Sequence, residues 1–388
     1  MRTEKLYEDD SHLRQFTAKV LSCEEGPSGW EVRLDRTAFY PEGGGQPWDL
    51  GMLGGVQVTK VLERDGEVFH ILDQQLEAGA EVPGEIDWPR RLDLMQQHSG
   101  EHILSGLVHQ NFGYDNVGFH MGRETITVDF NGELEEQQLR EIERKANEVV
   151  WQDLPVRILY PDKAALAALP YRSKKKLTGR VRVVEYPGVD LCACCGTHVA
   201  RTGEIGLILL LSCVKFRGGV RIEMLSGGRA LAYTEEVLAQ NRKISNVLSA
   251  KPLETASAVQ RTQDALTQVK YRLMQTEEQL FARKAEALRG SGQAVLFEEN
   301  LDPDGVRRLA IAVSQQCSGL AAVFSGDEER GYHYALCGEQ GDLRLLSREM
   351  NAALDGQGGG KPTFVQGSVR AARAQIEDFF QKQEKVDD

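Results

Sequence analysis

Two histidines four residues apart constrain this chain more than any other feature. His98 and His102 lie in Gln97-His98-Ser99-Gly100-Glu101-His102, inside a stretch whose apolar residues recur at helical spacing. A helix has about 3.6 residues per turn, so both imidazoles point from one face. They can share a zinc ion whose remaining ligands come from another segment. Alone, this spacing fits a structural pair equally well.

A second segment, Leu191-Cys192-Ala193-Cys194-Cys195-Gly196-Thr197-His198, repeats the spacing in Cys194 and His198. Thiolate and imidazole are the usual zinc ligands. The sequence therefore predicts one Zn²⁺ per chain, held by His98, His102, Cys194 and His198. The chain has seven cysteines, an odd number, and three of them crowd here. This favours metal or thiol chemistry over a disulfide framework and indicates a reducing compartment.

Length and charge limit the broad class. The 388 residues suffice for roughly two to four domains. No apolar run approaches the roughly 18 residues of a membrane span, and the polar start is unlike a signal peptide. We therefore expect a cytoplasmic protein without a membrane partner. The net charge of -12 argues against polyanion binding over the whole surface. Residues 171–182 are an exception, and they suit either phosphate contacts or a solvated loop; their basic residues are Arg172, Lys174, Lys175, Lys176, Arg180 and Arg182.

The expected fold is α/β (α+β) in four parts. Residues 1–86 read as a small β-barrel, with strands at 16–23, 30–34, 56–62 and 68–72 and a turn at Asp65-Gly66. Residues 87–230 form an α/β zinc-containing domain. Its histidine helix opens with Asp87 as N-cap and Pro89 in the first turn.

The last two parts are a helical hairpin at 231–289 and an α/β domain at 290–388. The hairpin breaks at Lys251-Pro252, and its second arm carries Val259, Leu266, Leu273 and Leu280 at heptad spacing. This stripe packs either on the first arm or on a second subunit. In the last domain we expect a helix at 306–313, strands at 320–324, 332–336 and 343–346, and a helix from 370. Its glycine-rich stretch 358–368, with Lys361, reads as a phosphate-binding loop or a plain loop.

Four ordered motifs resemble those of free-standing alanyl-tRNA editing proteins of the AlaX type, relatives of the editing domain of alanyl-tRNA synthetase. They are Phe39-Tyr40-Pro41-Glu42-Gly43-Gly44-Gly45-Gln46-Pro47 with Asp49 and Gly51, the His98/His102 pair, the Cys194/His198 pair followed by Val199, and residues 202–206 with 219–223. The tail from Gly290 resembles the DHH-associated domain of longer family members. No segment resembles an aminoacylation core, so the resemblance implies an editor acting in trans.

The resemblance implies hydrolysis of the ester in tRNA(Ala) mischarged with serine or, second, glycine. The substrate would lie on Gly43, Gly44, Gly45 and Gln46. Thr37 is the candidate for recognising the seryl hydroxyl, with a surface-strand threonine as the alternative. His120 is a weaker candidate for proton transfer or hydroxyl recognition. The candidate tRNA contacts are Lys174, Lys175, Lys176 and Lys361, and a homodimer through the hairpin or the last domain is a further expectation.

Several alternatives stay open on sequence alone. The family usually has glycine where this chain has Cys195, so Cys192 or Cys195 competes with Cys194, which alone keeps the spacing to His198. Zinc would polarise the ester carbonyl, activate water or hold the amino group. Two other functions compete: a non-catalytic tRNA-binding protein with structural zinc, and an inverzincin peptidase in which Glu101 of His-x-x-Glu-His is the base.

Overall fold

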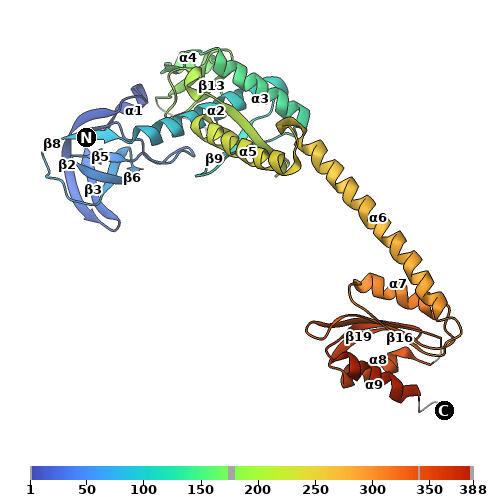
Figure 1. Ribbon diagram of the computed structural model, residues 1–388. Helices are drawn as coiled ribbons and strands as arrows, with labels where there is room; N and C mark the ends of the chain where they lie inside the picture. Colours follow the sequence, from blue (N-terminus) through green and yellow to red (C-terminus); the bar gives the residue numbers. More distant parts are fainter. Residues whose placement is uncertain (1, 174–179, 340, 385–388) are drawn as a thin grey trace. The chain divides into compact units, whose positions relative to one another are not determined.

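The computed structural model describes residues 2–173, 180–339 and 341–384. It divides into two compact units, residues 1–243 and 244–388 (Figure 1). Both units combine helices with β-sheets, which confirms the mixed α/β class expected from the sequence. Lys174, Lys175 and Lys176, the predicted tRNA contacts, lie outside the described residues.

The first unit begins with a closed barrel around an apolar core. Its strand order is β2-β3-β7-β6-β5-β8. Asp65 (φ 54°) and Gly66 (φ 82°) join β6 to β7, as a two-residue hairpin with left-handed backbone requires. A short parallel pair, β1 with β4, forms a separate two-stranded sheet. The elements are β1 (Glu4–Lys5), α1 (Leu6–Asp9), β2 (Gln15–Gly26), β3 (Gly29–Leu34), β4 (Arg36–Thr37), β5 (Gly51–Leu53), β6 (Val56–Arg64), β7 (Glu67–Leu72) and β8 (Glu81–Ile86).

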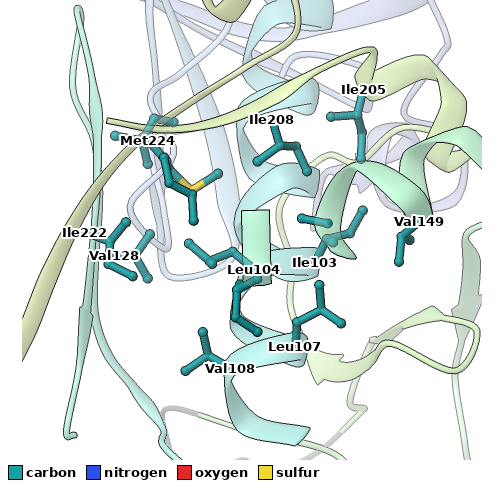
Figure 2. Close-up of a cluster of buried hydrophobic side chains, with 14 of the residues drawn as sticks. Ile103, Leu104, Leu107, Val108, Val128, Val149, Ile205, Ile208, Ile222 and Met224 are labelled. Carbon is teal, nitrogen blue, oxygen red and sulfur yellow. The ribbon is translucent and has the colours of Figure 1, made fainter. Parts of the chain in front are cut away.

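Helix α2 (Trp88–Phe112) follows the barrel and carries the two histidines. The Asp87 side chain accepts a hydrogen bond from the Arg90 amide at 3.2 Å, and Gly113 ends the helix at φ 71°. Figure 2 shows the apolar residues of its C-terminal half, Ile103, Leu104, Leu107 and Val108, inside one buried cluster with residues from the neighbouring sheet and α3. The histidines therefore lie on a helix that is fixed by its own core.

The rest of the first unit packs around α2. A four-stranded sheet in the order β14-β15-β10-β9 and a three-stranded sheet in the order β11-β12-β13 flank it. The 3₁₀ turn Thr202–Ile205 contacts both α2 and α3. The elements are β9 (Asn116–Met121), β10 (Ile126–Phe130), α3 (Glu136–Trp151), β11 (Arg157–Leu159), α4 (Lys163–Ala168), β12 (Val183–Tyr186), β13 (Asp190–Ala193), β14 (Ile208–Phe216), β15 (Gly219–Ser226) and α5 (Gly227–Leu248).

The second unit contains helix α6 and a five-stranded sheet in the order β16-β17-β18-β20-β19. The helical region is interrupted near Lys251-Pro252, where a short 3₁₀ turn, Pro252–Glu254, precedes α6. The heptad residues of α6 are all exposed. The elements are α6 (Thr255–Ala287), β16 (Ala294–Glu298), α7 (Pro303–Ser314), β17 (Ala321–Asp327), β18 (Gly331–Cys337), α8 (Leu343–Ala353), β19 (Gly356–Lys361), β20 (Phe364–Val369) and α9 (Arg373–Glu384).

Two expectations for the second unit are wrong. Residues 343–346 were predicted as a strand but form the first turn of α8. The buried residues of this helix, Leu343, Ser347 and Met350, follow a helical period. A stretch of four residues is too short to reveal that period in the sequence. The glycine-rich stretch at 358–368 is no loop, because it forms the β19–β20 hairpin at the sheet edge. A Cβ on Gly358 would lie 2.5 Å from the Tyr334 hydroxyl, so close packing explains that glycine. Lys361 is exposed at the end of β19.

Within the described ranges, no helix has both the length and the apolar character that crossing a membrane requires.

Candidate metal centre and adjoining cavity

The structure brings the four predicted zinc ligands together. His98 and His102 project from α2, and Cys194 and His198 follow β13. The candidate ligand atoms of these four residues all lie within 4.8 Å of one another. His98 Nε2 and Cys194 Sγ are 3.4 Å apart. Three imidazoles and one thiolate at this separation can surround a single tetrahedral ion.

Hydrogen bonds to the outer ring nitrogens orient two of the ligands. His98 Nδ1 donates to Gln46 Oε1 at 2.8 Å, and His102 Nδ1 donates to Asp190 Oδ2 at 2.9 Å. Because each Nδ1 then carries the proton, Nε2 presents its lone pair to the centre of the cluster. Arg172 in turn donates to both oxygens of Asp190, at 2.7 and 2.8 Å. The outer hydrogen bonds thus select the tautomer that a metal needs.

Gln46 connects the glycine-rich motif to both ligand pairs. Besides His98, its Oε1 accepts from the Thr197 amide at 3.1 Å, and its Nε2 donates to Thr197 Oγ1 at 2.8 Å. Close approach also requires glycine at Gly196, since a Cβ there would lie 2.2 Å from the His98 ring. This explains why a motif more than fifty residues away accompanies the histidine pair in the sequence.

The electrostatics of the cluster suit a cation. Burial opposes the thiolate form of Cys194, but the electrostatic influence of the neighbouring His98 holds its pKa well below its usual range. Burial lowers the pKa of His198 well below the ordinary value, which favours the neutral imidazole. His102 Nε2 and both ring nitrogens of His198 are buried and have no hydrogen-bond partner among the described residues. Buried ring nitrogens seldom lack a partner, so this donor set fits a zinc ion.

A cavity of about 390 Å³ adjoins the cluster. The glycine-rich motif, α2, β13 and the segment after β13 all contribute lining residues. Gly45 has φ 91°, and a Cβ there would lie 2.8 Å from the Phe119 ring, so only glycine fits. The residues that line the cavity include Tyr7, Glu8, Tyr40, Glu42, Gly43, Gly44, Glu63, His98, Glu101, His102, Phe119, Arg172, Cys192, Cys194, Cys195 and Gly196.

Thr37 is close to this motif but does not line the cavity. It is fully buried, and its hydroxyl is 2.8 Å from His70 Nε2 and accepts from the Phe39 amide at 3.0 Å. His70 Nδ1 donates to the Val32 carbonyl at 3.1 Å, so Thr37 is the donor to Nε2. Burial lowers the pKa of His70 to about 4, which keeps this ring neutral. The Thr37 hydroxyl is therefore engaged in buried hydrogen bonds with His70 and the Phe39 amide.

His120 also lies away from the cavity wall. It is exposed on β9, whereas its neighbour Phe119 lines the cavity. Successive side chains of a strand point to opposite faces, so the two residues cannot share the site. Lys361 belongs to the second unit and is no part of this cavity.

Sequence reasoning missed Asp190 and the particular role of Arg172. Asp190 is buried in β13 directly behind His102, and no local pattern distinguishes it from other acidic residues. Arg172 was noted only as one member of a basic stretch. A metal-bound histidine commonly has a carboxylate behind it, but that rule does not identify which of the chain's carboxylates it is.

Replacing Cys195 with glycine should leave zinc binding intact. Cys195 is exposed. It belongs neither to the cluster of His98, His102, Cys194 and His198 nor to the second group of possible ligands, which consists of His102, Asp190 and Cys192. We expect Cys195→Gly to keep one zinc per chain by metal analysis of the purified protein. Loss of zinc in this variant, together with its retention in Cys194→Ala, would show that the wrong cysteine has been assigned.

Two parts of the chain match known protein families. Residues 181–223, which include Cys194 and His198, match the family described as threonyl and alanyl tRNA synthetase second additional domain. Residues 7–90 match the family of class II (A) tRNA synthetases. These matches place two parts of the chain among domains that occur in aminoacyl-tRNA synthetases.

Full-length relatives identify the family. The chain is 30% identical to the alanyl-tRNA editing protein AlaX-L of Pyrococcus horikoshii, over 97% of this chain and 96% of that protein. It is also 30% identical to the alanyl-tRNA editing protein Aarsd1-A of Xenopus laevis, over 96% of each. An alanine–tRNA ligase of Ignicoccus hospitalis is 31% identical, over 92% of this chain but 40% of the ligase. The chain belongs to the alanyl-tRNA editing protein family.

Proposed function

We propose that the chain is a zinc-dependent hydrolase that removes serine, and secondarily glycine, from mischarged tRNA(Ala). The observation that carries the proposal is a cluster of four candidate ligands, three of which (His98, His102 and Cys194) line a cavity of about 390 Å³. The full-length relatives of the chain are named alanyl-tRNA editing proteins. A 3′-terminal adenosine with an attached small amino acid is of suitable size for such a cavity. Editing of this kind is needed because one pocket discriminates poorly between small side chains.

The residues of the chain have separable tasks in this reaction. Gln46 and Asp190 fix the rings of His98 and His102, and the cavity wall from Tyr40 to Gly44 leaves backbone accessible to the ester. Zinc, when bound, would supply a fixed positive charge that favours the developing oxyanion. Because four protein ligands fill a tetrahedral shell, the binding of the amino acid falls to the other residues of the cavity.

The peptidase alternative has little support. Glu101 does line the cavity, but its Oε1 accepts from the Ser105 hydroxyl at 2.6 Å and from the Asn116 amide. Among the described residues, the group around His98 and His102 is completed by Cys194 and His198, whereas an inverzincin needs a glutamate ligand.

Deacylation assays test the proposal directly. We expect the zinc-replete protein to release serine from Ser-tRNA(Ala) faster than alanine from Ala-tRNA(Ala), with Gly-tRNA(Ala) between them. Removing zinc with a chelator should abolish the release, and returning zinc should restore it. If the zinc-replete protein binds tRNA(Ala) but hydrolyses none of the three, the protein is a tRNA-binding protein with structural zinc.

Thr37→Val should reduce the selectivity for serine. We include in the proposal that Thr37 acts on selectivity by fixing the start of the glycine-rich motif, through His70 and the Phe39 amide. The variant leaves two buried polar groups unpaired, and each costs about 1–3 kcal/mol. It should lower the rate on Ser-tRNA(Ala) more than on Ala-tRNA(Ala), with zinc retained, while Thr37→Ser keeps the wild-type ratio. An unchanged serine-to-alanine ratio in Thr37→Val would remove Thr37 from the selectivity mechanism.

The proposed partners are tRNA(Ala) and a second copy of the chain. The basic stretch around Arg172 to Arg182 borders the cavity through Arg172, which supports contacts with the acceptor end of the tRNA. Lys361 is exposed and stays a candidate tRNA contact in the second unit. The exposed heptad stripe of α6 supports a homodimer through this helix.

A further inference from the structure

Tyr7 contributes a polar group to the cavity from the first residues of the chain. It lies on α1 and lines the cavity, although only 2% of its surface is exposed. Its backbone carbonyl accepts from Ser11 Oγ at 3.4 Å. Among the residues that the structure describes, none forms a hydrogen bond with the Tyr7 hydroxyl. Buried hydroxyl groups seldom lack a partner in folded proteins, so this one calls for an explanation.

Contacts of the ring and of the backbone hold Tyr7 in place. Its ring meets the Tyr40 ring edge to face, with centroids 5.3 Å apart and an angle of 80° between the planes. The carbonyl of the next residue, Glu8, accepts from Arg182 Nε at 3.1 Å. Arg182 Nη1 also donates to the Cys194 carbonyl at 2.8 Å. One guanidinium thus joins the helix of Tyr7 to the segment that carries a candidate metal ligand.

The surroundings of the phenol oxygen limit what it can bind. Burial raises the pKa of Tyr7 well above its ordinary value, and the cavity residues Glu63 and Glu8 raise it further. The hydroxyl therefore keeps its proton and can donate a hydrogen bond. The two carboxylates disfavour a negatively charged acceptor at this position, even though Glu63 pairs with Lys5 at 2.7 Å. A neutral oxygen is the better partner.

Two other hydroxyl groups near the glycine-rich motif are already engaged. The Tyr40 hydroxyl donates to the Gly43 carbonyl at 3.0 Å. The Thr37 hydroxyl is 2.8 Å from His70 Nε2 and does not line the cavity. Neither is placed to meet a hydroxyl group of the substrate, whereas Tyr7 lines the cavity and has its hydroxyl available.

We propose that the Tyr7 hydroxyl binds the hydroxyl group of the seryl side chain, and that this contact favours serine over alanine. This inference rests on the proposed function. The seryl hydroxyl is separated from the ester carbonyl by two carbon atoms, so the group that binds it must adjoin the groups that act on the ester. Tyr7 meets this requirement, because it shares the cavity with Cys194 and is joined to the Cys194 segment through Arg182. Alanine has no hydroxyl to accept this hydrogen bond.

Binding of two analogues of nearly equal size tests the assignment. The first is 3′-deoxy-3′-serylaminoadenosine, and the second is its 2-aminobutyryl counterpart, in which a methyl group replaces the seryl hydroxyl. In titration calorimetry, the wild-type protein should bind the seryl analogue about two- to tenfold more tightly, as one hydrogen bond between neutral groups implies. Tyr7→Phe keeps the ring that packs against Tyr40 and should lose this preference. The loss should come from weaker binding of the seryl analogue.

Tyr160→Phe is the matched control. The Tyr160 hydroxyl donates to the Glu8 carbonyl at 3.4 Å, and Tyr160 is outside the cavity lining. The variant therefore removes a phenol hydroxyl that contacts the same helix, and it should keep the preference for the seryl analogue. Elemental analysis should find the same zinc content in both variants. In deacylation assays, Tyr7→Phe should lower the ratio of the rates on Ser-tRNA(Ala) and Ala-tRNA(Ala) by a similar factor.

The outcomes are distinguishable from a failure of the proposed function. Equal binding of the two analogues by the wild type, a preference that persists in Tyr7→Phe, or equal weakening of both analogues in that variant would each overturn the assignment of Tyr7. The hydrolase stands in these cases if the wild type deacylates Ser-tRNA(Ala). If no mischarged tRNA is deacylated but the analogue preference depends on Tyr7, the site for the seryl hydroxyl stands and the hydrolase falls.

Discussion

Cys194→Ala should purify without stoichiometric zinc. The Cys194 thiolate is one of the four candidate ligands, and the neighbouring His98 holds its pKa well below the usual range even though burial opposes the anion. Without it the remaining imidazoles form a three-ligand site, and most of the metal affinity should be lost. Elemental analysis of the purified protein and equilibrium dialysis against zinc measure the effect.

Cys192→Ala is the matched control for this loss. Cys192 is buried two residues away and groups with His102 and Asp190, but it does not belong to the four-residue cluster. It should keep one zinc per chain. Zinc loss in Cys192→Ala with retention in Cys194→Ala would contradict the assignment.

Zinc should also be released on acidification. Protons compete with the metal for the Cys194 thiolate and for the histidine nitrogens, so affinity falls as pH falls. Removing an outer hydrogen bond, as in Gln46→Ala, should weaken zinc binding by about 10- to 100-fold rather than abolish it, because the four ligands themselves remain.

Asp49→Ala should destabilise the first unit by about 3–5 kcal/mol, the usual effect of leaving a buried charge without its partner. Arg91 and Asp49 are both fully buried. Arg91 Nε donates to the two Asp49 oxygens at 2.9 and 3.0 Å, and Nη2 of Arg91 donates to Asp49 as well. Asp49 also accepts from the Tyr40 amide at 2.6 Å. The pair connects the glycine-rich motif to α2, the helix that carries the two candidate ligands His98 and His102.

Urea unfolding followed by tryptophan fluorescence measures this change. All four tryptophans, Trp30, Trp48, Trp88 and Trp151, belong to the first unit, so the signal reports that unit. Arg144→Ala removes an exposed pair with Glu148 and should change stability little, because such pairs contribute about 0–1 kcal/mol. Adding Arg91→Met to Asp49→Ala should recover part of the loss. A change of less than about 1 kcal/mol for Asp49→Ala would show that Arg91 finds other partners.

Two short pairs with the same spacing predicted the four candidate ligands that the structure brings together. The His98/His102 and Cys194/His198 pairs each occupy a few residues, and the helix begins at Asp87 as its capping side chain indicates. Helical periodicity and capping depend on residues within one or two turns of each other, so both can be predicted from the sequence. The same reasoning failed at residues 343–346, where the predicted strand covers barely more than one helical turn and therefore shows no helical period.

Only the tertiary structure determined which side chains surround the ligands. Gln46 and Asp190 lie 52 and 88 residues from the histidines that they orient. The sequence marked Thr37 as a selector beside a glycine-rich motif, yet the fold turns its hydroxyl to His70. It likewise placed His120 near the site, but the pleat of β9 presents Phe119 to the cavity instead. Contacts over such separations depend on the register and packing of whole strands, which no local pattern specifies.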